Sequence, residues 1–341
     1  MLEDQGLREV LGVDNDQKYL ATTGIKNQVR LWNTETWALE RVIVTGHNEQ
    51  ITQVEFSHDG RLLASSSLDG FVKLWDVKTG EFIKEIQFKA PVGDVSFSPD
   101  SNEIAIMLRP HRTQQLSKLF VFKLDDLEFR EIEMIFSNHS FSSDKQNVQF
   151  SPSADFIAVL AHNEIHIVET GTMEEEHLPI CWSTHVDKNN FIRNQEDHFY
   201  YNLDFSKDGT ELICSTLNGI VSYSTKKIQT NPRKISNIDC EFCKFSFDGK
   251  HIVHSSKKRI EGSASVYPVE IMDTETYRET YELLKPDSEG YLCNINTSPS
   301  ESLIGIQTNQ AQELIIVDMN GATVQVLDDF ETNDWIFTFS N

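Results

Sequence analysis

Two adjoining stretches decide the fold of this chain: GHNEQITQVEFSHDG at residues 46–60 and LLASSSLDGFVKLWD at residues 62–76. Apolar and β-branched residues alternate with polar ones in both stretches, which is the period of a β-strand with one buried face. Asp69-Gly70 separates two such runs, and this dipeptide is typical of a tight hairpin turn. The stretches therefore predict antiparallel strands joined by short turns.

The same pattern returns along the chain. The segment YLATTGIKNQVRLWN at residues 19–33 aligns without gaps with residues 62–76. The turn FSHDG at residues 56–60 recurs in fainter copies, which begin at Phe97, Phe150, Phe205, Phe245 and Thr297. A turn that returns in register indicates a repeated structural unit rather than strands spaced by chance.

The combination of GH, FSHDG, SSSLDG and LWD at residues 46–76 resembles the repeat of the WD40 family. The position of Trp75 can be followed through the copies as Trp32, Trp75, Phe122, Val168, Ser224, Met272 and Val317, at intervals of 43 to 56 residues. A four-stranded blade takes about 40–45 residues. The resemblance therefore implies an all-β fold, a seven-bladed β-propeller of four-stranded antiparallel blades, as one domain over residues 1–341.

Two alternatives concern the closure of the ring. The segment WIFTFSN at residues 335–341 has the pattern of an innermost strand, and it could complete the first blade as a clasp. Residues 7–13 could instead supply that strand, in which case the chain would be the propeller module of a longer sensor or scaffold protein, cut within a blade. We expect the clasp.

Composition narrows the classes of partner. The 30 basic and 53 acidic residues give a net charge of −23, and such a surface repels the phosphate backbone of a nucleic acid. A protein partner with a basic segment is expected, within a hetero-complex, and no apolar run is long enough to cross a membrane. The five cysteines are few and odd in number, and no secretory signal begins the sequence, so we expect a cytoplasmic or nuclear protein.

His47, Ser65 and Asp69 suggest a hydrolase at first sight. The resemblance implies a structural role instead: in WD40 blades a histidine bridges an aspartate and a serine, here Ser65 or Ser67, and a tryptophan, here Trp75, caps them. No nucleophile motif such as GxSxG, no phosphate loop and no metalloprotease motif occurs. We therefore expect no catalytic residue, no cofactor and no enzyme activity.

Cys240, Cys243, His251 and His254 form the series C-x2-C-x7-H-x2-H, which resembles a zinc site on paper. Residues three apart on a strand point to opposite faces of the sheet, so each pair would be split. We expect no metal at these positions and buried cysteines.

Long loops mark one side of the expected ring, where the segments leading into the innermost strands and the hairpins between second and third strands open together. The hairpin of the third blade carries Arg109 and Arg112, and that of the sixth carries Lys257, Lys258 and Arg259. Residues 174–198 lengthen the segment leading into the fifth blade. The basic tips could contact an acidic partner or, locally, phosphate, and long loops on a rigid scaffold are common sites of function.

The resemblance also implies contact positions four and six residues before the phenylalanine of each FSxDG turn. In consecutive blades these are Phe199, Tyr201, Asp239, Glu241, Tyr291, Cys293, Asn333 and Trp335. Aromatic faces attract a cation and carboxylates neutralise it, so this arc suits a lysine or arginine side chain. We therefore expect a non-catalytic interaction scaffold; the alternative is a propeller enzyme with a pocket at the mouth of the channel.

Overall fold

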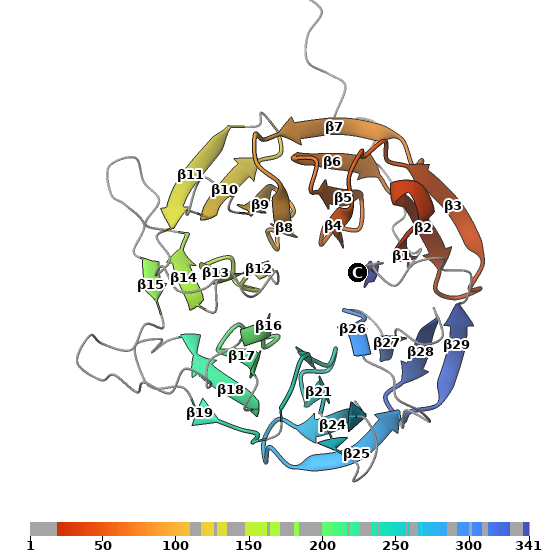
Figure 1. Ribbon diagram of the computed structural model, residues 1–341, viewed down its shortest axis with the longest axis vertical. Coiled ribbons are helices and arrows are strands. Elements are labelled where there is room, and N and C mark those ends of the chain that lie inside the picture. The colour runs from red at the N-terminus through yellow and green to blue at the C-terminus, as the bar shows by residue number, and fades with distance from the viewer. Residues whose placement is uncertain are drawn as a thin grey trace, which may run out of the picture.

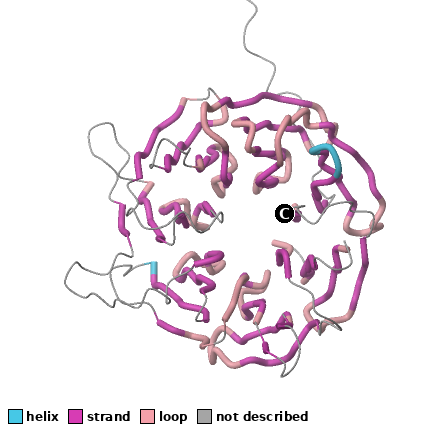
Figure 2. Tube along the Cα trace, viewed as in Figure 1, coloured by secondary structure: helices cyan, strands magenta, loops and turns pink. Residues whose placement is uncertain are grey.

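Seven four-stranded antiparallel sheets radiate from a central axis in the computed structural model (Figure 1), and strands dominate the trace (Figure 2). The structure describes residues 19–109, 117–125, 128–134, 147–161, 164–170, 181–183, 200–216, 219–225, 233–237, 239–256, 258–259, 265–266, 268–284, 292–299, 302–308, 313–327 and 337–340. Within these ranges, no helix is long and apolar enough to cross a bilayer. The sheets are the seven blades that the sequence predicts.

Blades 1 to 3 each have four strands that run in order from the axis outward. Blade 1 holds β30 (Phe337–Phe339), β1 (Tyr19–Gly24), β2 (Gln28–Asn33) and β3 (Leu39–Val44), with the short helix η1 (Ile25–Asn27) between β1 and β2. Blade 2 holds β4 (Ile51–Phe56), β5 (Leu62–Ser67), β6 (Phe71–Asp76) and β7 (Phe82–Gln87). Blade 3 holds β8 (Val92–Phe97), β9 (Glu103–Leu108), β10 (Ser117–Lys123) and β11 (Phe129–Met134).

Blades 4 and 5 follow in the same order. Blade 4 holds β12 (Asn147–Phe150), β13 (Phe156–Ala161), β14 (Glu164–Glu169) and β15 (Cys181–Ser183). Blade 5 holds β16 (Tyr200–Phe205), β17 (Glu211–Thr216), β18 (Gly219–Ser224) and β19 (Arg233–Lys234).

Blades 6 and 7 complete the ring. Blade 6 holds β20 (Cys243–Phe245), β21 (His251–Ser255), β24 (Val269–Asp273) and β25 (Glu279–Leu284). A separate two-stranded ribbon, β22 (Lys258–Arg259) and β23 (Ser265–Val266), lies in the connection between β21 and β24. Blade 7 holds β26 (Leu292–Thr297), β27 (Leu303–Thr308), β28 (Leu314–Asp318) and β29 (Thr323–Leu327).

The C-terminal strand closes the ring. β30 pairs antiparallel with β1, and the Tyr19 N–H donates to Ser340 Oγ at 2.6 Å while the Ser340 N–H donates to the Tyr19 carbonyl at 2.7 Å. Phe337 is 1% exposed, and its ring lies over Gly305 of blade 7, where a Cβ atom would overlap it. The expected clasp is therefore present; residues 7–13, the alternative source of this strand, lie outside the described residues.

The hydrophobic core lies between the blades. Each of seven buried clusters draws its residues from two neighbouring blades, including one that joins blade 7 to the clasp through Leu314, Ile316 and Phe337. A single four-stranded sheet has two apolar faces and cannot cover either alone, so each blade is stabilised by its neighbours.

The FSxDG turns join the first and second strands of a blade. In blade 2 the Ser57 hydroxyl donates to Asp59 Oδ1 at 2.6 Å and accepts the Leu62 N–H at 2.9 Å, and Gly60 adopts a φ of 68°. Ser101 and Ala154 hold the corresponding left-handed position in blades 3 and 4, both with a φ of 60°. A residue with a Cβ atom is strained in the left-handed conformation, which glycine adopts readily. The turns of blades 3 and 4 therefore keep this conformation without a glycine.

Candidate functional site: the rim and the central channel

Two surfaces are candidates for function. We call "rim" the side of the ring that carries the segments leading into the innermost strands and the hairpins between second and third strands. We call "channel" the axial space that the innermost strands surround in Figure 1. Both surfaces are built by equivalent positions of the seven repeats.

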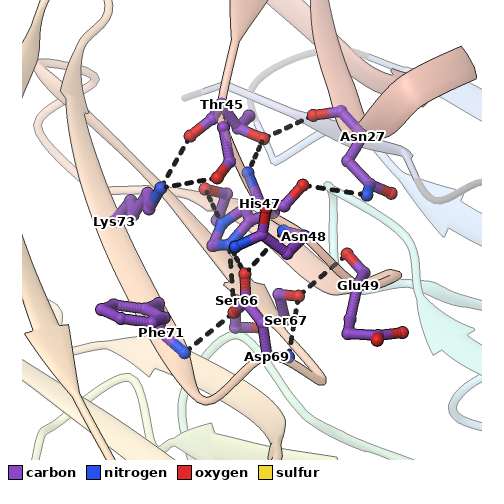
Figure 3. Close-up of polar contacts among 12 residues, drawn as sticks. Asn27, Thr45, His47, Asn48, Glu49, Ser66, Ser67, Asp69, Phe71 and Lys73 are labelled. Carbon is purple, nitrogen blue, oxygen red and sulfur yellow. Dashed lines mark hydrogen bonds and ion pairs between the residues drawn. The ribbon is translucent and has the colours of Figure 1, made fainter.

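The structure brings the four tetrad residues of blade 2 together. Figure 3 shows two of them, His47 and Asp69, with the polar residues around them. His47 Nδ1 lies 3.0 Å from Asp69 Oδ2, and His47 Nε2 lies 3.0 Å from Ser65 Oγ. The Trp75 indole N–H donates to the same Ser65 oxygen at 3.0 Å. Ser67, the other serine considered from the sequence, donates instead to the Glu49 carbonyl at 3.0 Å.

The environment of the tetrad opposes catalysis. Burial lowers the pKa of His47 below its usual value, although Asp69 acts in the other direction. Asp69 keeps a lowered pKa despite its burial because the N–H groups of Asn48 and Phe71 and the His47 ring stabilise its charge. Ser65 is fully buried and is hydrogen-bonded to both ring systems, so a substrate cannot reach its hydroxyl. The group ties the hairpin of β5 and β6 to the segment before β4.

Blade 1 retains part of this arrangement. The Trp32 indole N–H donates to Thr22 Oγ1 at 2.9 Å, in the way that Trp75 donates to Ser65. Lys26 stands where blade 2 has Asp69 and adopts a left-handed φ of 59°. The tryptophan–hydroxyl bond therefore survives without the histidine and aspartate.

Two members of the proposed arc, Asp239 and Glu241, lie in the described segment leading into β20. Both are partly exposed at the rim. The Glu241 N–H donates to Ser255 Oγ at 3.2 Å, and the Glu241 carbonyl accepts the Ser215 hydroxyl at 2.9 Å. These contacts to β21 and β17 fix the backbone from which the carboxylate projects.

The other members of the arc are not placed in the same detail. Tyr201 lies in β16, but its side chain is outside the described part of the chain. Phe199, Tyr291, Asn333 and Trp335 also lie outside it, as does the side chain of Cys293 in β26. The arc as a whole stays a prediction.

The basic tips are described only in part. Arg109 begins the connection between β9 and β10, where its N–H donates to the Pro91 carbonyl at 2.8 Å. Lys258 and Arg259 form β22, which places their backbone in the ribbon between β21 and β24 of blade 6. Arg112, Lys257 and residues 174–180 and 184–198 of the long fifth-blade loop lie outside the described residues.

The polar lining of the channel was not anticipated from the sequence. The residue before the FSxDG phenylalanine, or before its counterpart, faces the axis in every blade, and all seven line one cavity of about 320 Å³: Glu55, Ser96, Gln149, Asp204, Lys244, Asn296 and Thr338. The residues one step earlier point into the blades and are at most 3% exposed: Val54, Val95, Val148, Leu203, Cys243, Ile295 and Phe337. The period-two alternation in the sequence could have revealed this polar face.

Channel side chains hold neighbouring blades together. The described innermost strands do not pair with one another, so each leaves backbone N–H groups without a strand partner. Glu55 Oε1 accepts the Phe97 N–H at 3.1 Å, Asp94 Oδ2 accepts the Val148 N–H at 2.8 Å, and Asp204 Oδ2 accepts the Phe245 N–H at 2.8 Å. Each carboxyl thus bonds to the innermost strand of another blade.

Two of these carboxyls titrate far from their usual range. Burial, with a contribution from Asp94, raises the pKa of Glu55 from 4.5 to about 8. Burial raises the pKa of Asp94 from 3.8 to about 7. Asp204 instead lies 3.1 Å from Lys244 Nζ and raises the pKa of that ammonium although burial lowers it.

Within the described residues, one group has the spacing to hold a metal ion. His254, Glu270 and Glu279 offer ligand atoms that all lie within 4.8 Å of one another. Cys240 and Cys243 are not part of it; both are free and buried in one core cluster between blades 5 and 6, and burial raises their thiol pKa values. The expected split of this pair between two faces of the sheet is therefore wrong, because Cys240 precedes β20 instead of lying in it.

Comparison with known proteins agrees with this architecture. Residues 39–76 match the family model described as WD domain, G-beta repeat. The crystal structure of the Cps50 (Swd1) β-propeller domain of Myceliophteria thermophila superposes with a TM-score of 0.64 at 17% identity. It covers 87% of this chain and 91% of that one, which shows the propeller fold.

Curated relatives include subunits of protein complexes. The target of rapamycin complex subunit LST8 of Saccharomyces cerevisiae is 37% identical over 95 residues, or 28% of this chain and 31% of that protein. The Set1 complex component swd1 of Schizosaccharomyces pombe is 23% identical over 282 residues, or 80% of this chain and 56% of that protein. The chain thus spans about a third of the first relative and just over half of the second.

Proposed function

We propose that this chain, a seven-bladed propeller that carries a WD40 repeat, is a non-catalytic subunit of a hetero-protein complex whose rim binds a basic segment of a partner. Support for the complex comes from relatives whose names place them in the target of rapamycin and Set1 complexes. The chemistry of the segment is inferred from the residues of the rim.

The observation that carries the basic partner is the pair of partly exposed carboxylates at the rim of blade 6. The backbone of Glu241 is held on both sides by Ser255 and Ser215, so the placement of its carboxylate needs little ordering when a partner binds. Asp239 lies two residues earlier in the same segment. The net charge of −23 adds a long-range attraction for a cationic segment. Tyr201 and Trp335, if they complete the arc, would supply aromatic faces at ~0.5–2 kcal/mol each.

The test uses the full chain with an affinity tag. Proteins that co-purify are identified by mass spectrometry, and the segment that binds is mapped and synthesised as a peptide. Rim variants Asp239→Asn with Glu241→Gln, and Tyr201→Ala with Trp335→Ala, are then titrated with this peptide. We expect each pair to weaken affinity by at least about tenfold, equivalent to ~1.4 kcal/mol.

A matched control changes the same amount of charge on the opposite side of the ring. Asp125 and Glu275 are exposed in the turns between third and fourth strands of blades 3 and 6, so Asp125→Asn with Glu275→Gln should leave affinity unchanged. Equal affinity for the rim variants and this control, with native circular dichroism, would discard the rim as the binding surface.

The basic tips support a second contact, separate from the arc. Arg112 and the segment Lys257–Arg259 would meet an acidic surface of a partner. Reversing their charge should weaken binding at low salt and matter less at high salt, because exposed pairs are screened. A salt response identical to that of the unmodified chain would remove this contact.

One observation favours the alternative of an enzyme with a pocket in the channel. Glu55 lines the cavity, Asp94 bonds to Asn147 in its wall, and the two carboxyls have pKa values of about 8 and about 7. Groups shifted in this way are common in active sites. An enzyme built on them would lose turnover in Glu55→Gln while rim binding of a partner remained. Such a loss would overturn the non-catalytic assignment.

We also place the protein in the cytoplasm or nucleus. The three described cysteines whose thiols are seen, Cys214, Cys240 and Cys243, are free, which a reducing compartment maintains. Microscopy of the fluorescently tagged chain tests this location.

A further inference from the structure

The channel contains more carboxyl groups than ammonium groups. Its cavity of about 320 Å³ is lined by the carboxyls of Glu55 and Asp204 and by the ammonium of Lys244. A third carboxyl, that of Asp94, accepts the amide N–H of Asn147 in the cavity wall at 3.1 Å. Lys244 Nζ lies 3.1 Å from Asp204 Oδ1, so this pair is neutral as a unit. Glu55 and Asp94 lie on neighbouring innermost strands, β4 and β8, and no comparable ion pair joins either to another described residue.

Other cationic groups at the cavity are engaged elsewhere. Lys207 Nζ donates to the Phe247 carbonyl at 3.3 Å and lies 4.4 Å from the centre of the Phe247 ring. Burial lowers the pKa of His58, which keeps its imidazole neutral near pH 7.

The donors that reach the two carboxyls are uncharged. Glu55 accepts the Phe97 N–H and the Ser96 hydroxyl. Asp94 accepts the Val148 and Val95 N–H groups and the side-chain amides of Asn147 and Gln53. The positive charge that acts on both carboxyls is that of Lys244, which lowers the pKa of each but is itself paired with Asp204. A second cation hydrogen-bonded to Glu55 and Asp94 would add stabilisation to their ionised forms.

The cavity wall also offers two acceptors with no donor. Asn147 directs its amide nitrogen to Asp94 at 3.1 Å, and Gln149 directs its amide nitrogen to Asp204 at 3.1 Å. Their carbonyl oxygens, Asn147 Oδ1 and Gln149 Oε1, are buried and have no hydrogen-bond partner in the described structure. Buried polar atoms are rarely left in this state, so both oxygens are free to accept from a donor that enters the cavity.

We propose that the channel is a binding site for an organic cation, a primary ammonium or guanidinium group, held by Glu55 and Asp94 with Asn147 and Gln149 as further acceptors. Such groups carry three or five N–H donors, enough for several acceptors spread around a ring. The cation is either a free polyamine or the lysine or arginine side chain of a protein. The second case rests on the proposed function.

The spacing favours an organic cation over a metal ion. A metal site needs at least three ligand atoms close together. In the described chain, His254, Glu270 and Glu279 are the set of this kind within 4.8 Å, and it includes none of the three channel carboxyls. A divalent ion needs donors about 2.0–2.6 Å from its centre. The cavity, of about 320 Å³, accommodates an alkylammonium chain.

Binding should release protons. Glu55, with a pKa of about 8, and Asp94, with a pKa of about 7, hold protons near neutral pH because both are desolvated and Asp94 adds its charge to the surroundings of Glu55. The other charged groups around them are Asp204 and Lys244, with His58 and Lys207 at the turn end of the cavity. A cation at the two carboxyls stabilises their ionised forms, so affinity rises as the pH passes through about 7 to 8.

The experiment is a calorimetric titration of the purified full chain with two probes, spermidine and the peptide acetyl-Gly-Gly-Lys-Gly-Gly-amide. The same peptide with norleucine in place of lysine is the neutral control. We expect binding of at least one cationic probe, affinity about tenfold higher at about pH 8.5 than at about pH 6, and proton release measured from two buffers of different ionisation enthalpy. Spermidine alone indicates a free amine, and the lysine peptide indicates a protein side chain.

Variants locate the site. Glu55→Gln and Asp94→Asn keep the shape of each side chain, and each should weaken the bound probe at least tenfold and reduce proton release. Asp125→Asn on an exposed turn should change neither. Binding by neither probe, or equal binding by the norleucine peptide, or affinity unchanged in both channel variants would overturn the proposal. A probe that loses affinity in Tyr201→Ala with Trp335→Ala but not in Glu55→Gln binds the rim and counts against the channel, so failure of the rim and failure of the channel are distinguishable.

Discussion

Replacing Ser65 with alanine tests how far one buried hydroxyl stabilises blade 2. Ser65 Oγ lies 3.0 Å from His47 Nε2 and 3.0 Å from Trp75 Nε1. Ser65, His47 and Trp75 are 0%, 6% and 5% exposed, so water cannot replace the lost partner. The substitution leaves two buried polar nitrogens unpaired within an otherwise unchanged hairpin.

The expected loss of stability follows from the number of nitrogens left unpaired. An unpaired buried polar group costs about 1–3 kcal/mol, so two of them should lower the free energy of unfolding by about 2–6 kcal/mol. A second substitution, Trp75→Phe, removes one of these nitrogens altogether. The double variant should therefore be more stable than the sum of the single effects predicts, by at least about 1 kcal/mol.

Urea unfolding followed by far-ultraviolet circular dichroism measures all four proteins without relying on the fluorescence of Trp75. Thr36→Ala on the exposed turn between β2 and β3 is a suitable control, because its hydroxyl accepts the exposed Ala38 N–H at a long 3.4 Å. A loss below about 0.5 kcal/mol in Ser65→Ala, or simple additivity in the double variant, would refute the view that the tetrad stabilises the blade.

Three further predictions concern the channel, the turns and the clasp. The folded pKa of Glu55, about 8, exceeds its usual 4.5, so the unfolded chain loses this proton first and stability falls as the pH rises between these values. Glu55→Gln should therefore raise the free energy of unfolding by about 2 kcal/mol at about pH 9 and leave it unchanged at about pH 4. The full pKa shift would correspond to ~5 kcal/mol, and the expected effect is smaller because water enters the channel. Equal effects at both pH values would contradict this prediction. Ala154→Gly should stabilise by about 0.5–1 kcal/mol in urea unfolding because it relieves a left-handed residue, whereas Gly209→Ala at the matching turn should destabilise. Phe337→Ala should cost about 3–5 kcal/mol and increase hydrogen exchange in β1; unchanged exchange there would argue against the clasp.

Local sequence chemistry was sufficient to predict the blades. The turn residues of FSxDG form the same hydrogen bond in four blades, from Ser57, Ser98, Ser206 and Ser246 to the aspartate two positions on. These contacts span two residues, so the sequence carries them directly. The tetrad of blade 2 has the same advantage, since the motif specifies all four side chains and the structure places them within hydrogen-bond distance.

The contacts within the channel could not be predicted from the local sequence. Alternation indicates that Asp204 and Lys244 face the axis, but their contact joins residues 40 apart on different blades. The shifted pKa of Glu55 depends on Asp94 and on burial by seven separate strands, a condition that one strand does not encode. The rim is intermediate: the repeat register located Asp239 and Glu241, whereas the contacts that hold their backbone come from β17 and β21.

The pairing of β1 with β30 has a consequence for the order of assembly. Blades 2 to 7 arise from hairpins between consecutive strands, which form in microseconds, but blade 1 needs residues more than 300 positions apart to meet, as the bond between Tyr19 and Ser340 shows. Until they do, the inner edge of β1 is an open template that the same strand of another molecule can occupy. Concentrated refolding should therefore yield dimers that exchange this strand, and dilution should suppress them.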